Sequence, residues 1–283
     1  MSAQLRGGAL AVAALLVLAG CNLLPGQAQG DHLERVRAAN TLWAFTDPAY
    51  PPQSFIDEDG AYAGFDIDVT RDIARRLGVE NVDFTTPRFS IAVAGNWAGR
   101  FDIAVGSITI TEERKNVLDF TQVYYYTPAQ LATHPTSGIS SVADFAGRSI
   151  CAGEDTTYVD WLESALNLPP EAGEVGDPPA NVTVVQLPTD VNCPTAWNLG
   201  RFDFDGWLTA QQTAQQAIDD GLPVVLVGEP VFFEPLAVAF DKSVTDNDSL
   251  VAEVDRIIGE MHSDGTLTQL SEKWYGIDIT KGD

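Results

Sequence analysis

From residue 41 onward, short runs rich in β-branched and aromatic residues alternate with segments of helical period. This alternation limits the possible folds of the 283-residue chain more than any other feature. Segments 41–46 and 103–108 have the composition of strands, and we expect a helix at 90–97 before the second of them. Segment 66–77 has apolar residues three or four positions apart and ends at Gly78, which is typical of an amphipathic helix. The pattern predicts α/β layering with largely parallel strands.

A second series of the same kind begins after Ser140 and repeats the architecture of the first half. The repeat predicts two lobes, with a cleft suited to a small ligand where the carboxyl ends of the strands meet. Segment 169–179 interrupts this series with Gly, Pro and acidic residues of no apolar period, so we expect an exposed loop there. The elements expected in this half are helices 142–146, 158–166 and 191–199 and strands 148–152, 182–187 and 204–208.

The first twenty residues predict export from the cytoplasm. An apolar run of eleven residues, 9–19, is too short to cross a bilayer and fits the core of a secretory signal. Leu18-Ala19-Gly20-Cys21 follows and resembles a bacterial lipobox, in which the peptide is cut before Cys21 and that cysteine receives lipid; ordinary secretion is the alternative. We expect 1–20 to be a lipoprotein signal peptide and 21–33 a flexible tether. The rest would be an extracytoplasmic body in the cell envelope, anchored to the membrane by lipid.

The charge excludes one large class of partners. The chain carries 16 Lys plus Arg against 40 Asp plus Glu, a formal net charge of -24, and no basic stripe reverses this locally. Such a surface repels a phosphate backbone, so nucleic-acid binding is excluded. The acidic excess is typical of a solubilising surface, or of one adapted to salty surroundings.

The cysteines and histidines bear on redox state and metals. Once Cys21 is modified, Cys151 and Cys193 remain as an even pair in a compartment that permits disulfides, and we expect them to be bonded. Two buried free thiols are the alternative. The three histidines show no ligand spacing, so the sequence predicts no metal site and no cofactor.

A set of motifs resembles one known family. Their order and spacing, over about 42–276, are similar to those of the extracytoplasmic solute-binding proteins of ABC importers, in family 3, which mostly binds polar amino acids. The motifs are Asp47-Pro48-Ala49-Tyr50-Pro51-Pro52, Asp59-Gly60, Gly64-Phe65-Asp66-Ile67-Asp68, Arg76-Leu77-Gly78, Gly99-Arg100-Phe101-Asp102, Thr109-Ile110-Thr111-Glu112-Glu113-Arg114, Asp119-Phe120-Thr121, Asp264-Gly265-Thr266 and Lys273-Trp274-Tyr275-Gly276.

The resemblance implies a fold and a mechanism. The fold would be the two-lobed periplasmic-binding-protein-like fold of type II, with lobe 1 at 34–128 plus 233–283 and lobe 2 at 129–232. Hinge strands would lie near 128–132 and 232–236. A ligand that contacts both lobes shifts the population toward closure. A monomer of this kind would bind a small carboxylate-bearing solute, most simply an amino acid or derivative, and an ABC permease would recognise the closed shape.

The resemblance also assigns binding residues in lobe 1. Arg114 would hold the ligand's α-carboxylate, because a guanidinium is a fixed fork of donors that matches it. Ser107 and Thr109, at the end of the preceding strand, would face the cleft or else cap a turn. Asp47, Tyr50 and Phe89 would form the wall around the ligand's variable part; for the two aromatic residues, ordinary packing is the alternative. The expected ligand-binding residues of this lobe are Asp47, Tyr50, Phe89, Ser107, Thr109 and Arg114.

In lobe 2 the chain departs from the family pattern. Thr156 and Thr157 match a Gly-Thr-Thr element that binds the carboxylate, although Asp155 replaces the glycine and a simple N-cap role for Thr156 stays open. Leu208 occupies the position where the family has an Asp that receives the ligand's ammonium. Either Asp155 or Asp205 serves instead, or the ligand lacks an α-amino group.

Two other functions remain as alternatives to transport. A dehydratase-type enzyme exists on this scaffold and would need a general acid in the cleft, for which Glu229 and Glu234 are the candidates. A ligand-sensing module would need a membrane receptor as its partner. Because the sequence has no assembled nucleophile and base, we expect a binding protein without catalysis and without catalytic residues.

Overall fold

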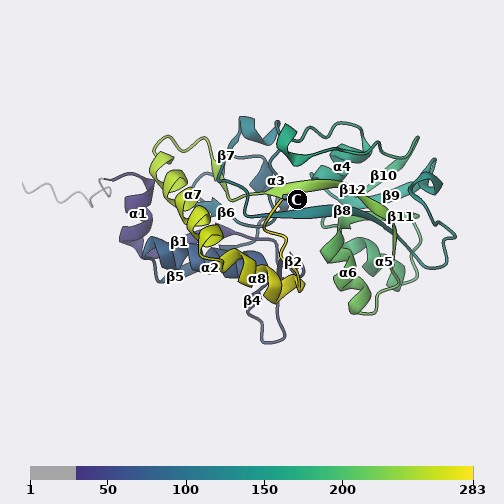
Figure 1. The fold of residues 1–283 in the computed structure, drawn as a ribbon, viewed down its shortest axis with the longest axis horizontal. Helices are drawn as coiled ribbons and strands as arrows, with labels where there is room; N and C mark the ends of the chain where they lie inside the picture. Colours follow the sequence, from purple (N-terminus) through teal and green to yellow (C-terminus); the bar gives the residue numbers. More distant parts are fainter. Residues whose placement is uncertain (1–29, 283) are drawn as a thin grey trace, which may run out of the picture.

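The structure, a computed structural model, describes residues 30–282 and contains two lobes that lie side by side (Figure 1). Each lobe is built around its own five-stranded sheet, and the chain passes between the sheets twice. The expected signal peptide, the lipidation site Cys21 and most of the tether lie outside the described residues. No helix of the described part is long and apolar enough to cross a membrane.

The first lobe holds a mixed sheet in the order β5-β1-β6-β13-β7. β1 is parallel to β5 and β6, whereas β13, which returns from the second lobe, is antiparallel to β6 and β7. A small antiparallel sheet, β2-β3-β4, is inserted after β1. The elements are α1 (His32–Ala39), β1 (Thr41–Phe45), β2 (Ala49–Tyr50), β3 (Ser54–Ile56), β4 (Tyr62–Ala63), α2 (Phe65–Leu77), β5 (Asn81–Thr85), α3 (Phe89–Val93), β6 (Ile103–Ala104), η1 (Arg114–Asn116), β7 (Leu118–Phe120), β13 (Ala239–Asp241), α7 (Asp248–Ser263) and α8 (Thr266–Tyr275).

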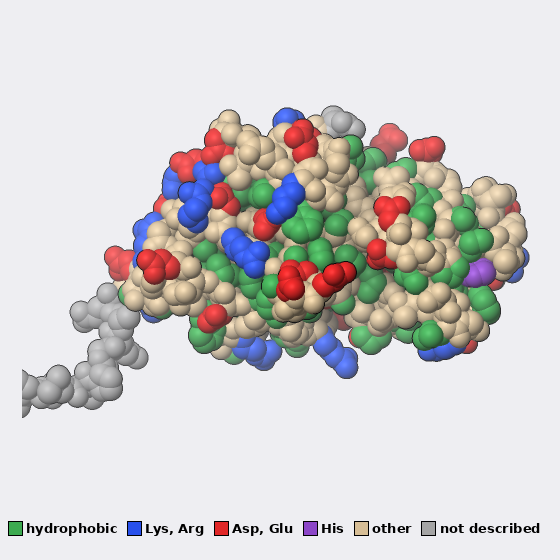
Figure 2. All heavy atoms as spheres, turned by 90° about the horizontal axis from the view of Figure 1, so that it is seen from below, with side chains coloured by type: hydrophobic (Ala, Val, Ile, Leu, Met, Phe, Trp, Pro, Cys, Tyr) green, Lys and Arg blue, Asp and Glu red, His purple; other side chains and the backbone are tan. Residues whose placement is uncertain are grey.

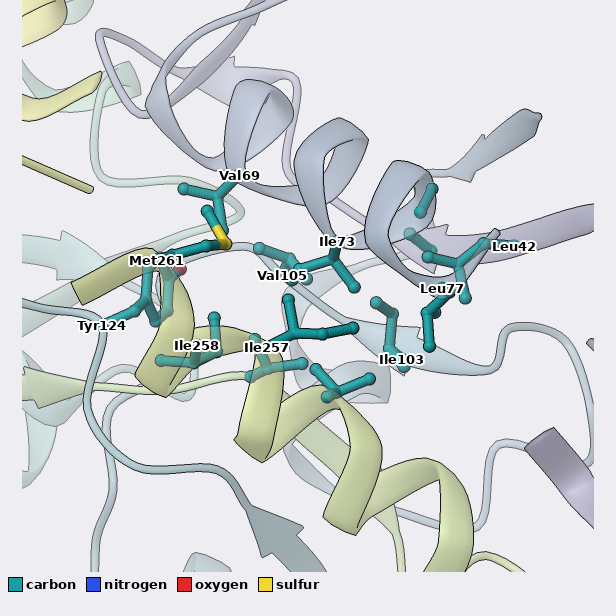
Figure 3. Close-up of a cluster of buried hydrophobic side chains, with 14 of the residues drawn as sticks. Leu42, Val69, Ile73, Leu77, Ile103, Val105, Tyr124, Ile257, Ile258 and Met261 are labelled. Carbon is teal, nitrogen blue, oxygen red and sulfur yellow. The ribbon is translucent and has the colours of Figure 1, made fainter. Parts of the chain in front are cut away.

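The main core of this lobe lies between the sheet and the helices α2 and α7 (Figure 3). Val69, Ile73 and Leu77 form the apolar stripe of α2 and pack toward Ile257 of α7. Each such side chain contributes about 1.5–3 kcal/mol when it is fully buried. Gly78 adopts a φ of 79° and ends α2, in agreement with the helix expected from the periodicity. A second cluster, with α3, covers the other face of the sheet.

The second lobe has a sheet in the order β10-β9-β11-β8-β12. β9 is parallel to β10 and β11, whereas β8 is antiparallel to both β11 and β12. Apolar clusters cover both faces of the sheet. The elements are β8 (Tyr125–Thr133), η2 (Val142–Phe145), β9 (Ser149–Gly153), α4 (Thr157–Leu162), η3 (Pro170–Ala172), β10 (Thr183–Leu187), α5 (Asn192–Asn198), β11 (Gly206–Ala210), α6 (Gln211–Asp219) and β12 (Val225–Leu236).

In each sheet four of the five strands run in the same direction, as expected, and one strand, β13 or β8, is antiparallel to its neighbours. Two other expectations need correction. The helix expected at 90–97 ends at Val93, since Gly95 and Asn96 adopt positive φ. Segment 169–179 is not simply an exposed loop: the Trp161 ring N–H donates to the Gly176 carbonyl (2.6 Å), whose own N–H donates to Val231 of β12 (2.9 Å).

The crossing segments are β8 and β12, which pair antiparallel from Tyr125–Leu236 to Thr133–Val225 with one irregularity between Val227 and Phe232. The end of β12 also joins the first lobe, because Pro235 accepts a hydrogen bond from the Ile110 N–H (2.9 Å). The two lobes therefore share one two-stranded ribbon.

Several motif residues that are distant in sequence meet on the first lobe. Arg76 of α2 donates to Asp264 (2.8 Å) just before α8, and Lys273 and the Trp274 ring N–H of α8 both donate to Asp68 (2.6 and 2.8 Å). Figure 2 shows acidic and basic side chains intermixed over this lobe. These motif residues hold the amino- and carboxyl-terminal parts of the lobe together and do not line the pocket described next.

Candidate ligand-binding site

A pocket lies between the two lobes. Its volume is about 550 Å³ when the solvent at its open mouth is included. The carboxyl ends of β9, β10 and β11 point toward it from the second lobe, which is where open α/β sheets bind ligands. It is lined by Asp47, Tyr50, Gln53, Phe89, Gly106, Ser107, Thr109 and Arg114 of the first lobe, by Tyr125, Thr127 and Glu234 of the crossing strands, and by Gly153, Glu154, Thr156, Thr157, Tyr158, Pro188, Thr189 and Asp190 of the second lobe.

Arg114 is the one guanidinium that lines this pocket, and it is only 7% exposed. Its Nη1 donates to the Thr109 carbonyl (3.1 Å) and its Nη2 to the Asp155 carbonyl of the other lobe (3.0 Å). The group also lies over the Phe89 ring, 5.5 Å from its centroid, within cation–π range. Burial lowers the pKa of Arg114, and the Glu234 carboxylate opposes that effect. These contacts hold the planar group in one orientation at the pocket wall.

The other candidates of the first lobe also line the pocket. The Asp47 Oδ1 accepts the Ala49 N–H (3.0 Å), and burial raises the pKa of the Asp47 carboxyl. The Ser107 hydroxyl donates to Asp66 beneath the pocket (3.0 Å), and the Thr109 hydroxyl donates to Glu234 (2.7 Å). The structure thus brings together all six residues expected from this lobe.

Thr156 and Thr157 begin α4 and line the pocket from the second lobe. The Thr156 hydroxyl donates to the Gly153 carbonyl (2.8 Å), and the Thr157 hydroxyl donates to Glu234. Asp155 has the positive φ of 59° that a glycine would adopt, and its exposed side chain lies outside the pocket lining. Only its carbonyl takes part, as the acceptor for Arg114.

The two remaining candidates lie away from the pocket. Asp205 precedes β11, where its carboxylate accepts the Ser149 N–H (3.0 Å) and faces Arg148 (3.5 Å), at the opposite end of the strand from the pocket. Leu208 is fully buried in an apolar cluster with Ile150 and Val227. Neither residue, nor the Asp155 carboxylate, is placed to receive a ligand ammonium.

Asp190 is a pocket residue that the sequence reasoning missed. It follows β10 and is 3% exposed, and its Oδ2 has no hydrogen-bond partner among the described residues. Burial raises its pKa to about 7; the nearby Thr209 hydroxyl lowers it, and the charges of Asp47 and Glu234 raise it further. A buried carboxylate without a partner is costly, so the group is suited to a cation. Its place after a strand parallel to β9 is the signal that could have found it.

Glu234 was expected only as an acid for a dehydratase, and it lies at the centre of the polar network. It is 3% exposed on β12. Its Oε1 accepts from Thr109 (2.7 Å) and Thr157, and its Oε2 accepts from Tyr158 (2.7 Å) and Thr127 (3.3 Å). One carboxylate on a crossing strand therefore binds hydroxyls of both lobes. The other candidate acid, Glu229, is exposed on the same strand outside the pocket.

The expected disulfide is confirmed and supports this site. Cys151 of β9 is bonded to Cys193 of α5. Cys151 lies two residues before Gly153, and Cys193 lies three residues after Asp190. Both cysteines are fully buried in an apolar cluster. The bond fixes the segment that carries Asp190 to β9 of the second lobe.

A two-lobed α/β body with a polar pocket at the lobe junction is typical of solute-binding proteins. The chain matches the bacterial extracellular solute-binding proteins, family 3, over residues 42–277, and it belongs to this family. It is 29% identical to the L-cystine-binding protein TcyJ of Escherichia coli (strain K12), over 98% of this chain and 97% of that protein.

Two solved structures place this similarity in three dimensions. An ancestral arginine-binding protein bound to arginine is 27% identical, with a TM-score of 0.71 over 83% of this chain and 98% of that one. The ancestral amino acid-binding protein AncCDT-1, a precursor of cyclohexadienyl dehydratase, is 26% identical, with a TM-score of 0.71 over 86% of this chain and 99% of that one.

Proposed function

We propose that this chain is the substrate-binding component of an ABC importer and captures a solute with an amino group, an amino acid or a derivative, between its lobes. One observation carries the proposal: Arg114 and the unpartnered Asp190 Oδ2 line the same interlobe pocket from opposite lobes. A guanidinium and a carboxylate on facing walls are matched to a ligand with an acidic and an amino group. Asp190 takes the role that Asp155 and Asp205 cannot fill.

The mechanism would be closure about the ribbon of β8 and β12. Lobe 1 would comprise 34–128 plus 233–283 and lobe 2 129–232. A ligand that contacts Arg114 and Asp190 together gains its full binding energy only when the lobes are closed, so it shifts the population toward closure. The closed monomer would then dock on the permease. The sequence supports placing it outside the cytoplasm, held to the membrane by lipid on Cys21.

Binding without catalysis is favoured over a dehydratase-type reaction by the surroundings of Glu234. A dehydratase would need an acid in the pocket that donates a proton to the leaving group. Four hydroxyl groups donate hydrogen bonds to the Glu234 oxygens, which suits a carboxylate that accepts. Incubation with prephenate or arogenate should therefore leave these compounds unchanged, whereas turnover that is lost in Glu234→Gln would favour the enzyme.

The test of the binding function is a thermal-shift screen of the chain, unfolded and refolded to remove carried-over ligand, against amino acids and their deaminated analogues. A ligand at 100 times its Kd should add about 2.7 kcal/mol to the free energy of unfolding. Arg114→Ala should weaken binding by about 2–5 kcal/mol, since it removes a buried charged partner.

Arg201→Ala is the matched control, because Arg201 is exposed and pairs only locally with Asp203. It should retain the full shift. If no solute with an amino group stabilises the protein, or if Arg114→Ala binds as tightly as the control, the proposal fails.

A further inference from the structure

The carboxylate of Glu234 already engages the hydroxyl groups that a ligand carboxylate would seek. Thr109 and Thr157 lie on opposite walls of the pocket, and both donate to the same oxygen of Glu234. Tyr158 and Thr127 donate to the other oxygen. The protein therefore supplies from its own crossing strand a carboxylate that is fully hydrogen-bonded within the pocket.

The buried charges of the pocket do not balance. Asp47, Asp190 and Glu234 contribute three carboxyl groups, and Arg114 is the one basic group among the lining residues. A fourth acid, Glu154, lies at the rim, where it is 37% exposed and faces Arg88 at 3.8 Å. The interior of the pocket thus has carboxylates in excess of cations.

This imbalance discriminates between ligands. A zwitterion brings one charge of each sign and leaves the excess of carboxylates as it was, with its own carboxylate added near Glu234. A solute with an extra positive group compensates the excess, and a buried charge is tolerated only when it is paired. The additional cation also becomes a partner for Asp47 or for the Asp190 Oδ2. The Asp190 Oδ2 has no hydrogen-bond partner among the described residues.

We infer that the pocket selects solutes of net positive charge, such as an amino acid with a second basic group, and that Glu234 sets this preference. The inference rests on the proposed binding function and narrows it to one class of substrate. It gives Glu234, on the strand that joins the lobes, a role in specificity.

The experiment compares arginine with citrulline by titration calorimetry on the refolded chain. Arginine has a charged guanidinium where citrulline has a neutral ureido group of nearly the same size. We expect the wild-type protein to bind arginine at least tenfold more tightly than citrulline. Glu234→Gln keeps an oxygen acceptor for Thr109 and Thr157 and removes one negative charge, so the preference should fall by tenfold or more.

Glu229→Gln is the matched control, because it makes the same change at an exposed position of the same strand. It should keep the wild-type preference. Equal binding of arginine and citrulline by wild type, or a Glu234→Gln variant that weakens both ligands by the same factor, would overturn the inference while the proposed function stands. Where Glu234→Gln fails to fold, the wild-type ratio of arginine to citrulline affinity decides. Failure of every solute with an amino group to bind would instead count against the proposed function itself.

Discussion

The hydroxyl of Tyr50 lies 2.9 Å from the hydroxyl of Tyr158, and this contact joins β2 to the first turn of α4 across the pocket. Tyr158 donates in turn to Glu234 of β12 (2.7 Å). The two lobes and the crossing strand are therefore linked by consecutive hydrogen bonds. These contacts between the lobes would stabilise the proposed closed conformation, beside those that a ligand would add.

Removal of the Tyr50 hydroxyl should weaken ligand binding by destabilising the closed conformation. We expect Tyr50→Phe to lower the affinity about two- to tenfold, which corresponds to the net worth of one hydrogen bond, about 0.5–1.5 kcal/mol. Small-angle scattering should show a larger radius of gyration at subsaturating ligand. Tyr62→Phe, on β4 outside the pocket, is the control and should behave as wild type. Unchanged affinity in Tyr50→Phe would show that the contact does not support closure.

Ligand affinity should rise with pH through the titration of Asp190. Burial holds its pKa at about 7, with Asp47, Glu234 and Tyr50 as its charged or titratable neighbours, and only the ionised form attracts an ammonium group. Below pH 7 the affinity should increase up to about tenfold per pH unit and should level off above it. Calorimetry between about pH 5.5 and 8.5 measures this, and Asp190→Asn should bind weakly with a flatter profile. An affinity that does not change with pH would exclude Asp190 as the ammonium partner.

Stability should fall as pH rises through the window set by Asp66. This fully buried carboxyl beneath the pocket accepts hydrogen bonds from Tyr124 (2.8 Å) and Ser107, yet burial raises its pKa from 3.8 to about 7. Between these two values the folded state holds a proton that the unfolded state has released. The free energy of unfolding should therefore decrease by up to about 1.4 kcal/mol per pH unit for this carboxyl.

Denaturant titrations at several pH values check this slope. Asp66→Asn should reduce it, because the amide does not titrate, whereas Asp83→Asn at an exposed position should leave it unchanged. Asp190 contributes a slope of the same sign. A stability profile that rises between pH 5 and 7 in wild type, or that is identical in Asp66→Asn, would contradict the prediction.

Loss of the disulfide should destabilise the second lobe. The bond joins cysteines 42 positions apart, for which the chain-entropy account gives about 4 kcal/mol. We expect the double variant Cys151→Ala with Cys193→Ala to lose up to that amount in denaturant titration without reductant. Dithiothreitol should lower the melting temperature of wild type and leave that of the double variant unaffected. Equal melting temperatures of the two proteins in the absence of reductant would contradict the predicted stabilisation.

Sequence patterns predicted those parts of the fold and of the site that depend on contacts between residues near one another in the chain. The period of α2 and its glycine stop are visible in the chain, as is the Thr109-x-Thr111-x-x-Arg114 spacing, in which the Thr111 hydroxyl accepts the Arg114 N–H (3.1 Å). The α/β class follows from the alternation of such segments. These features require only contacts between residues near in sequence.

Finding Asp190, the proposed ammonium partner, required knowledge of the sheet. The family resemblance placed the acid position at Leu208, but that side chain faces an apolar cluster. Asp190 enters the pocket because β10 is the parallel neighbour of β9, which is a tertiary fact that spacing does not encode. Placing Glu234 in the pocket required knowing which face of the long strand β12 points between the lobes. The alternation of side chains along a strand leaves both faces possible.

Because Glu234 lies on β12, the proposed specificity residue is part of the proposed hinge. A substitution there would alter the charge of the pocket and the stiffness of the ribbon at once, so substrate range and the rate of opening would change together. During the evolution of such proteins, the outer pocket residues could be substituted one at a time. A change at this position would have to be matched on both lobes, at Thr109 and Thr157, before transport recovered.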